Sequence, residues 1–209
     1  MSLKLTTAAL LALAVSSAPA FACSMTQNSQ VINPPNLTTT DPSWSAFNDA
    51  TFTIGGGNAT VTVPSNEWGG VVYGGKFVNT GDICVSVVIN NDPNGGAGII
   101  FGDTASDTFM FEIWANGQAD VSDSNTQGWL SPVAEVASSL VKTGANASNE
   151  LRITWNASSA SAYINGQLFQ TFPISAFQGS KIGLEVESGG GANPTSAQFS
   201  NFSVTAASQ

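Results

Sequence analysis

The chain has 209 residues, 42% of them hydrophobic and 9% charged, and its 14 acidic and 5 basic side chains give a net charge of −9. This composition can fill the core of one domain, and the acidic balance excludes nucleic acid and anionic membrane surfaces as favourable partners. The sequence contains no histidine, which excludes Ser-His-Asp and Cys-His nucleophiles and His-ligated metal sites.

Residues 1–22 have the pattern of a secretory signal peptide. Lys4 supplies a positive charge, Ala8 to Val15 is a short apolar run, and Ala20-Phe21-Ala22 fits a small-x-small cleavage site. The run is too short to cross a bilayer, and no second apolar stretch of about 20 residues follows it. We therefore expect an exported bacterial protein, secreted or periplasmic, without a transmembrane segment.

Cys23 and Cys84 are the two cysteines of the chain, and Cys23 would be the first residue after cleavage. In an oxidising compartment the simplest expectation is that they form a disulfide. Lipidation of Cys23 is the alternative, although Ala20 stands where a lipobox usually has leucine. Two free thiols are the third alternative.

Residues 23–43 are rich in Ser, Thr, Asn and Pro and predict an extended leader, followed by one domain over residues 44–206. Short runs with the two-residue period of β-strands alternate with Gly/Asn turns along that domain. The Asn165-Gly166 pair suits a type I′ turn, and Asn116-Gly117 marks a second tight hairpin. The expected strands are Thr51–Ile54, Val61–Val63, Val71–Tyr73, Lys76–Val78, Ile83–Asn90, Ala97–Phe101, Phe109–Trp114, Ala119–Val121, Leu151–Trp155, Ser161–Ile164, Leu168–Phe172, Lys181–Val186 and Ala197–Thr205.

Ser131 to Val141 is ambiguous, because its apolar residues also fit helical spacing. Its serines and β-branched residues lower helix propensity, so the sequence favours a loop with a short edge strand. About a dozen short strands and little helix predict an all-β fold, an antiparallel β-sandwich.

Several motifs resemble the concanavalin A-like lectin/glucanase superfamily, nearest to its laminin G-like and 3-keto-disaccharide hydrolase-like domains of exported bacterial proteins. They are GAGIIFG at Gly96 to Gly102, FMFEIWANGQADV at Phe109 to Val121, AYINGQLFQTF at Ala162 to Phe172, GSKIGLEVESG at Gly179 to Gly189 and FSNFSV at Phe199 to Val204. The resemblance implies a jelly roll of two curved sheets, one with a concave face that binds sugars in many members.

The paired carboxylates of the retaining glucanases, an ExDxxE strand motif, are absent. The nearest stretch, Glu112 to Asp120, crosses a hairpin turn and does not place two carboxylates on one face of one strand. The sequence leaves open, without indicating any, other pairings among Glu112, Asp120, Asp123, Glu185 and Glu187. The sequence therefore leaves open whether the protein is an enzyme and favours a non-catalytic one, and Glu112 is the first carboxylate to test if the protein is a hydrolase.

Strand alternation predicts that four ligand-binding candidates share one sheet face, where aromatic rings could stack on a sugar and charged groups could bind its hydroxyls. These candidates are Glu112, Trp114, Arg152 and Tyr163. The alternative is a structural ion pair between Glu112 and Arg152 over an aromatic ring. Trp68 and Trp129, expected in loops, are weaker ligand candidates.

Asp92, Asp103 and Asp107 lie in expected turns and are weak candidates for calcium ligands, because calcium prefers carboxylate and carbonyl oxygens. Their spacing fits no known calcium loop, and turn formation is the commoner role of such aspartates. No other cofactor is expected.

Three functions are compatible with the sequence. The first is an exported carbohydrate-binding or surface-interaction module, and the second is a glycoside hydrolase of the 3-keto-disaccharide or glucanase type. The third is a structural protein of the envelope or matrix. The sequence does not indicate an oligomeric state.

Overall fold

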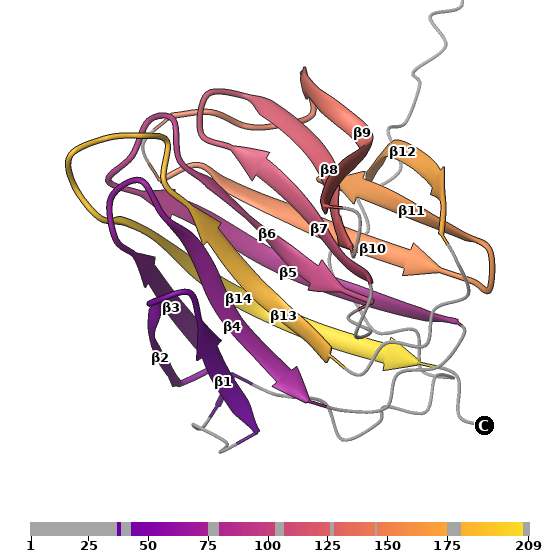
Figure 1. The fold of residues 1–209 in the computed structure, drawn as a ribbon, viewed down its shortest axis with the longest axis horizontal. Helices are drawn as coiled ribbons and strands as arrows, with labels where there is room; N and C mark the ends of the chain where they lie inside the picture. The colour runs from indigo at the N-terminus through magenta and orange to yellow at the C-terminus, as the bar shows by residue number, and fades with distance from the viewer. Residues whose placement is uncertain are drawn as a thin grey trace, which may run out of the picture.

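The protein is an antiparallel β-sandwich of two seven-stranded sheets (Figure 1). The computed structural model describes residues 37–38, 43–74, 80–102, 107–125, 128–144, 146–174 and 181–206, which contain 14 strands and no helix. Sheet A contains, in spatial order, β1 (Trp44–Phe47), β4 (Trp68–Gly74), β13 (Lys181–Glu187), β6 (Gly96–Phe101), β7 (Asp107–Trp114), β8 (Gln118–Asn125) and β9 (Gly128–Ala137). Sheet B contains β12 (Gln167–Pro173), β11 (Ser159–Ile164), β10 (Ser148–Trp155), β5 (Gly81–Asn90), β14 (Thr195–Ala206), β3 (Asn58–Val63) and β2 (Thr51–Gly55).

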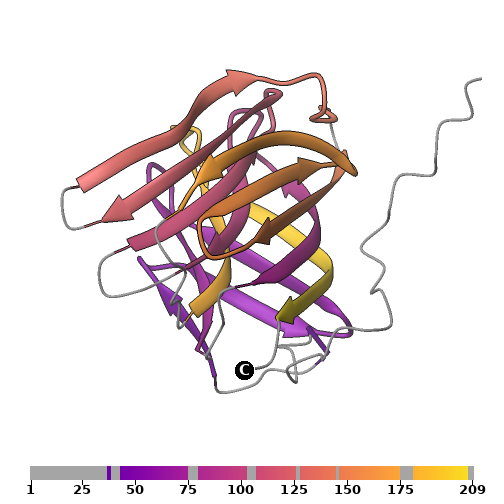
Figure 2. The ribbon, with the colours of Figure 1, turned by 90° about the vertical axis from the view of Figure 1, so that its right-hand side faces the viewer.

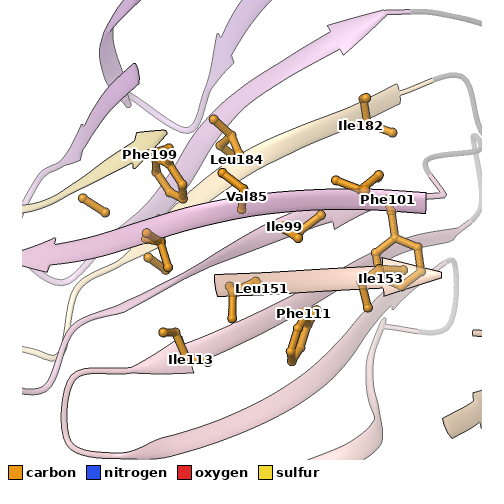
Figure 3. Close-up of a cluster of buried hydrophobic side chains, with 14 of the residues drawn as sticks. Val85, Ile99, Phe101, Phe111, Ile113, Leu151, Ile153, Ile182, Leu184 and Phe199 are labelled. Atoms are coloured by element: carbon orange, nitrogen blue, oxygen red, sulfur yellow. The ribbon is translucent and has the colours of Figure 1, made fainter. Parts of the chain in front are cut away.

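The core lies between the two sheets, and strand alternation selects the residues that fill it. Successive side chains of a strand point to opposite faces, so alternate apolar residues of β7 and β10 are buried, namely Phe109, Phe111 and Ile113 on β7 and Leu151, Ile153 and Trp155 on β10. Figure 3 shows part of this cluster, with Ile99 and Phe111 from sheet A and Val85 and Leu151 from sheet B. The remaining residues of each strand lie on an outer face. Side chains that can contact a ligand therefore lie on the outer faces of the two sheets.

The predicted fold class is confirmed, and the hairpin after Leu151 forms as expected. Strands β10, β11 and β12 are consecutive neighbours in sheet B. Asn165 and Gly166 have φ values of 52° and 77°, the left-handed conformation that a type I′ turn requires at both central positions. The expected strand at Lys76–Val78 lies outside the described residues.

The ambiguous stretch after Ser131 is an edge strand followed by a turn and not a helix, as the sequence favoured, but the strand is longer than the short one expected within a loop. Strand β9 covers Gly128–Ala137 and is the edge of sheet A, paired with β8 through an irregular register. Pro132 is tolerated there because an edge strand leaves some backbone N–H groups without a ladder partner. Most of its side chains are exposed, which explains why periodicity alone gave a weak signal.

Of the two cysteines, Cys84 lies within the described residues and Cys23 does not. Cys84 lies on β5, is 4% exposed and is not a free thiol. By alternation with Ile83 and Val85 its side chain lies on the outer face of sheet B. Cys23 and the predicted signal peptide lie outside the described residues, so the disulfide pairing stays a prediction.

One residue of the expected leader belongs to the core. Leu37 is 3% exposed and packs in the main hydrophobic cluster. The carbonyl groups of Leu37 and Thr38 accept hydrogen bonds from Gly57 and Gly56, in the turn between β2 and β3. In the described part of the chain, no helix is long and apolar enough to cross a membrane.

Candidate functional site

The four predicted ligand-binding residues do not share one sheet face. Glu112 and Trp114 lie on β7 of sheet A, whereas Arg152 and Tyr163 lie on β10 and β11 of sheet B. In all four cases the side chain alternates with core residues and so lies on an outer face, but the two outer faces are on opposite sides of the sandwich (Figure 2). The expected grouping is wrong, because alternation gives the face within a sheet and not the sheet to which a strand belongs.

Arg152 and Tyr163 form a self-contained structural group. The Arg152 guanidinium binds the Asp82 carboxylate, with Nε 3.0 Å from both carboxylate oxygens, and its Cζ lies 5.8 Å from the centre of the Tyr163 ring. The expected alternative, an ion pair between Glu112 and Arg152, is also wrong, because Asp82 on neighbouring β5 is the partner. The hydrogen bonds that Arg152 donates to the Asp82 carboxylate raise the pKa of Arg152. This group has its charges satisfied within sheet B.

On sheet A, carboxylates from three strands lie in one row across the outer face. Strand register aligns Glu185 of β13 with Gly98 of β6, Gly98 with Glu112 of β7, and Glu112 with Asp120 of β8. Neighbouring strands are about 4.8 Å apart, so the Glu112 and Glu185 backbones are separated by roughly 10 Å across the glycine. Gly98 at the middle position adds no side chain of its own between the two acids, and a β-carbon there would meet the β7 backbone.

Glu112 and Asp120 are neighbours because of the hairpin turn that separates them in the chain. The sequence set this pair aside since it crosses a turn. In the structure the three-residue connection after Trp114 closes the hairpin, with Gly117 donating to the Trp114 carbonyl at 2.9 Å, and the two acids become direct cross-strand partners. Two carboxylates therefore do share one sheet face, from two strands instead of one.

Two acids of this row, Glu112 and Glu185, are buried with an oxygen that has no hydrogen-bond partner. Glu112 is 4% exposed and Glu185 2% exposed, and the Oε1 atom of each has no hydrogen-bond partner. Burial raises the pKa of Glu112 well above its ordinary value, and the nearby charge of Asp120 adds to the effect. Burial and the charge of Glu112 raise the pKa of Glu185 in the same direction. In both side chains burial therefore disfavours the charged form.

Asp120 and Glu187 complete the acidic group. Burial raises the pKa of Asp120 to about 6, although its hydrogen bond from Trp114 opposes the shift. Burial and the charges of Asp120 and Glu135 raise the pKa of Glu187. A group of carboxyls whose pKa values all rise together is short of positive charge and of hydrogen-bond donors.

Trp114 is held in a fixed orientation beside these acids. Its indole Nε1 donates to Asp120 Oδ1 at 2.9 Å. Its ring covers Gly96 on neighbouring β6, where an added β-carbon would lie 3.2 Å from the ring atom Cε3. A side chain at that position would push the ring away. The ring is only half-buried and is available for stacking.

Trp68 and Trp129 show that sheet A curves toward this face. They lie on β4 and β9, five strand spacings apart, or about 24 Å in a flat sheet. Their ring centroids are nevertheless 5.2 Å apart in a T-shaped contact. Side chains alone cannot span that distance, so the sheet is concave, and the two rings meet above its face. Both residues lie in strands, not in the loops that the sequence suggested.

The concave face contains a cavity of about 300 Å³, which we call the acidic cavity. Met110 and Ser122 contribute to it, and its aromatic and acidic lining consists of Trp68, Glu112, Trp114, Asp120, Trp129 and Glu187. A second hollow of about 200 Å³, with Val72, Ile100 and Lys181 in its lining, shares Trp68 with it. The volume of the acidic cavity is at the lower end of the range for small-ligand sites.

The weak calcium candidates do not form a site in the described residues. Asp92 accepts hydrogen bonds from Asn94 N at 2.9 Å, Gly189 N at 2.8 Å and Thr195 Oγ1 at 2.7 Å. Burial alone would raise the pKa of Asp92, but these hydrogen bonds lower it overall. Asp92 thus joins the β5–β6 and β13–β14 connections. The side chains of Asp103 and Asp107 lie outside the described residues, and no three potential metal ligands converge within the described ones.

The two-residue period of β13 is a partial signal for Glu185 and Glu187, which were not among the predicted ligand-binding residues. In KIGLEVE, Ile182, Leu184 and Val186 fill the core, so alternation places Glu185 and Glu187 on the outer face. What the sequence could not give is that β13 and β7 lie on either side of β6. Asp123, also left open as a pairing partner, is opposite Phe109 and belongs to the other face.

Comparison with protein-family models and with curated proteins returns no match. Solved structures are similar in fold. A carbohydrate-binding module CBM66 from Bacillus subtilis matches with a TM-score of 0.59 and 13% identity over 78% of this chain and 96% of its own. The carbohydrate recognition domain of Emp47p matches with a TM-score of 0.58 and 12% identity, over 83% of this chain and 94% of its own.

A Bacillus subtilis protein described as having a galectin-like fold gives a TM-score of 0.60 and 10% identity, over 78% of this chain and 88% of that one. At these identities the likeness concerns the fold alone. The structural neighbours of the chain are thus galectin-like and carbohydrate-binding β-sandwiches.

Proposed function

We propose that the protein is an exported carbohydrate-binding module of the concanavalin A-like superfamily and that its ligand binds in the acidic cavity of sheet A. One observation carries this proposal. Three tryptophans, Trp68, Trp114 and Trp129, surround buried carboxyl groups on a concave sheet face. The signal-like residues 1–22 support export.

The chemistry of the cavity suits a sugar. One face of a pyranose ring carries C–H groups that pack on an indole, and its hydroxyls need polar partners. Trp114 supplies an oriented ring, since Asp120 holds its Nε1 and Gly96 leaves room beneath it. Glu112 supplies an oxygen that has no protein partner. A hydroxyl bound there would satisfy a group that is otherwise buried at a cost.

The structural neighbours support the proposal. Two of them are described as a carbohydrate-binding module and a carbohydrate recognition domain. The alternative of a purely structural envelope protein does not explain why the buried Glu112, with an oxygen that has no partner, lines a cavity.

The test is a glycan-array screen of the purified protein and its Trp114→Ala variant, with isothermal titration of any hit. We expect a specific hit that the variant weakens by on the order of 30-fold, the effect of truncating a central aromatic contact. Tyr163→Ala removes an aromatic ring from the outer face of sheet B and serves as the matched control, with unchanged binding. A blank array from folded protein, or equal losses in both variants, would contradict the proposal.

Glycoside hydrolysis is a second candidate, favoured by the raised pKa of Glu112 and Glu185. A neutral carboxylic acid beside an ionised one is the arrangement that glycosidases use for general acid catalysis. Turnover of a glycan that is lost in Glu112→Gln, with folding and binding retained, would establish this function. Binding without turnover would leave the module non-catalytic.

A further inference from the structure

The acidic cavity has an unusual charge balance. Glu112, Asp120 and Glu187 line it, Glu185 lies in the same row, and Glu135 on β9 acts electrostatically on three of them. No lysine or arginine is among its described lining residues. Of the basic residues nearest to sheet A, Lys181 lines the second hollow, and Lys142 lies in another depression and donates to the Ser148 carbonyl.

The missing positive charge is not supplied from within the described protein. Glu112 and Glu185 are each more than nine-tenths buried, with one carboxyl oxygen unpartnered. Asp92, which is 9% exposed, provides an internal contrast, because its carboxylate receives three hydrogen bonds. A buried carboxylate without a cation or donors is costly, and the cost falls when a ligand brings the missing charge.

The remaining lining identifies the kind of cation. The carboxyls are spread over four strands, and no three potential metal ligands converge among the described residues. Three indole rings complete the wall. Indole faces attract ammonium groups, and a set of such rings with nearby carboxylates is a way to bind an alkylammonium in preference to a bare ion.

We infer that the acidic cavity binds a cationic sugar, namely an amino-sugar unit with a free ammonium group, such as glucosamine in a deacetylated polysaccharide. This inference rests on the proposed carbohydrate-binding function. The sugar ring stacks on Trp114, and the ammonium lies between the carboxyls of Glu112, Asp120 and Glu187. The proposal explains in one step the aromatic walls, the excess acid and the unpartnered carboxyl oxygen of Glu112.

A definite pH dependence follows from the direction of the pKa shifts. In the free protein the cavity acids have raised pKa values, with that of Asp120 at about 6. A bound cation stabilises the ionised carboxylates and lowers these values, so binding releases protons. The affinity for a cation of fixed charge therefore rises as the pH rises from about 5 through 6 and above.

The experiment compares matched oligosaccharides by isothermal titration. Glucosamine hexamer and N-acetylglucosamine hexamer have the same sugar backbone. Each unit of the first has an ammonium group where the second has a neutral amide. We expect the glucosamine hexamer to bind at least about tenfold more tightly at pH 6. A trimethylated glucosamine oligomer has a charge that does not titrate, and its affinity should increase about tenfold or more between pH 5 and pH 8.

Two charge-removing variants test whether the preference for glucosamine arises in the acidic cavity. Glu112→Gln keeps the shape of the side chain and removes its charge, and should reduce the glucosamine preference to about twofold or less. Glu150→Gln makes the same change on the outer face of sheet B and should keep the full preference.

The outcomes separate the two proposals. Equal or tighter binding of the N-acetylated oligomer, still lost in Trp114→Ala, would overturn the cationic ligand and retain the carbohydrate-binding function. Binding of tetramethylammonium as tight as that of the amino sugar would overturn the role of the sugar ring. Failure of folded protein to bind any oligosaccharide would overturn both proposals.

Discussion

The two outer faces of the sandwich are built from the same pattern and differ in how their charges are satisfied. On sheet B, Arg152 binds Asp82 and lies beside Tyr163, and the hydroxyls of Ser161 and Thr171 are 2.8 Å apart across neighbouring strands. On sheet A, Glu112 and Glu185 have buried oxygens without partners. An outward charged residue beside an aromatic ring therefore identifies no function by itself.

Curvature accounts for much of this difference. The T-shaped contact between Trp68 and Trp129 shows that sheet A is concave, and a concave face removes its polar groups from water. Burial then raises the pKa of each carboxyl there. Proteins retain costly polar groups of this kind where a ligand uses them, so the stability cost on sheet A is itself an argument for a binding site.

The largest expected effect tests whether the glycine between the two acids is required by the fold. In Gly98→Ala the new β-carbon would overlap the carbonyl oxygen of Phe111 and lie 3.0 Å from the α-carbon of Glu112. Strands β6 and β7 would have to move apart, and we expect the free energy of unfolding to fall by about 3 kcal/mol. Chemical denaturation measures this loss.

Gly74→Ala on β4 is the matched control for Gly98→Ala, because a β-carbon at Gly74 meets no atom within 4 Å. It should change stability by less than about 0.5 kcal/mol. Similar losses in the two variants would show that the row of acids does not depend on this close strand approach.

A medium effect is expected for Glu185→Gln, and it depends on pH. The pKa of Glu185 is raised in the folded protein above its ordinary value of 4.5. At a pH well below 4.5 the Glu185 carboxyl is protonated in both the unfolded and the folded protein. As the pH rises, the unfolded chain loses this proton first, so the stability of the folded protein falls until the pH has passed the raised pKa. The variant has no such loss and should be more stable than the parent at pH 7, on the order of 1–3 kcal/mol.

Denaturation of both proteins at pH 4, 5, 6, 7 and 8 checks this prediction. The stability difference should be small at pH 4 and should grow with pH. A variant that is less stable than the parent at pH 7 would mean that Glu185 has a partner that stabilises its charge, and the contrast between the two faces would fail.

The smallest expected effect lies on sheet B. Asp82→Asn removes the carboxylate partner of Arg152, whose side chain is 39% exposed while that of Asp82 is 28% exposed. Water can solvate the guanidinium that is left, so we expect a loss below about 1 kcal/mol. The loss should shrink in high salt, where exposed charges are screened. A loss above 2 kcal/mol would show that this face is as dependent on its charges as sheet A.

The strand and turn chemistry could be predicted from local sequence. Alternation identified the core residues of β7 and β10, and the Asn165-Gly166 pair identified its turn, because both depend on neighbours within a few residues. The same rule correctly put Glu112 and Trp114 outside the core.

The site could be predicted only in part, because it depends on which strands become neighbours. Glu112 and Glu185 are 73 positions apart in sequence and come together only through β6. Glu112 and Asp120 required the register of a hairpin, and Trp68 and Trp129 required the curvature of the whole sheet. None of these three relations is encoded in a local period.

The sequence by itself determined the β-sandwich class, the acidic character and the face of each strand that points outward, since these follow from composition and from the two-residue repeat. The tertiary structure decided that Arg152 pairs with Asp82 rather than with Glu112, and that buried acids collect beneath three tryptophans on sheet A. Long-range strand order, register and curvature bring these residues together, and the desolvation that shifts their pKa values exists only once the sheet has curved over them.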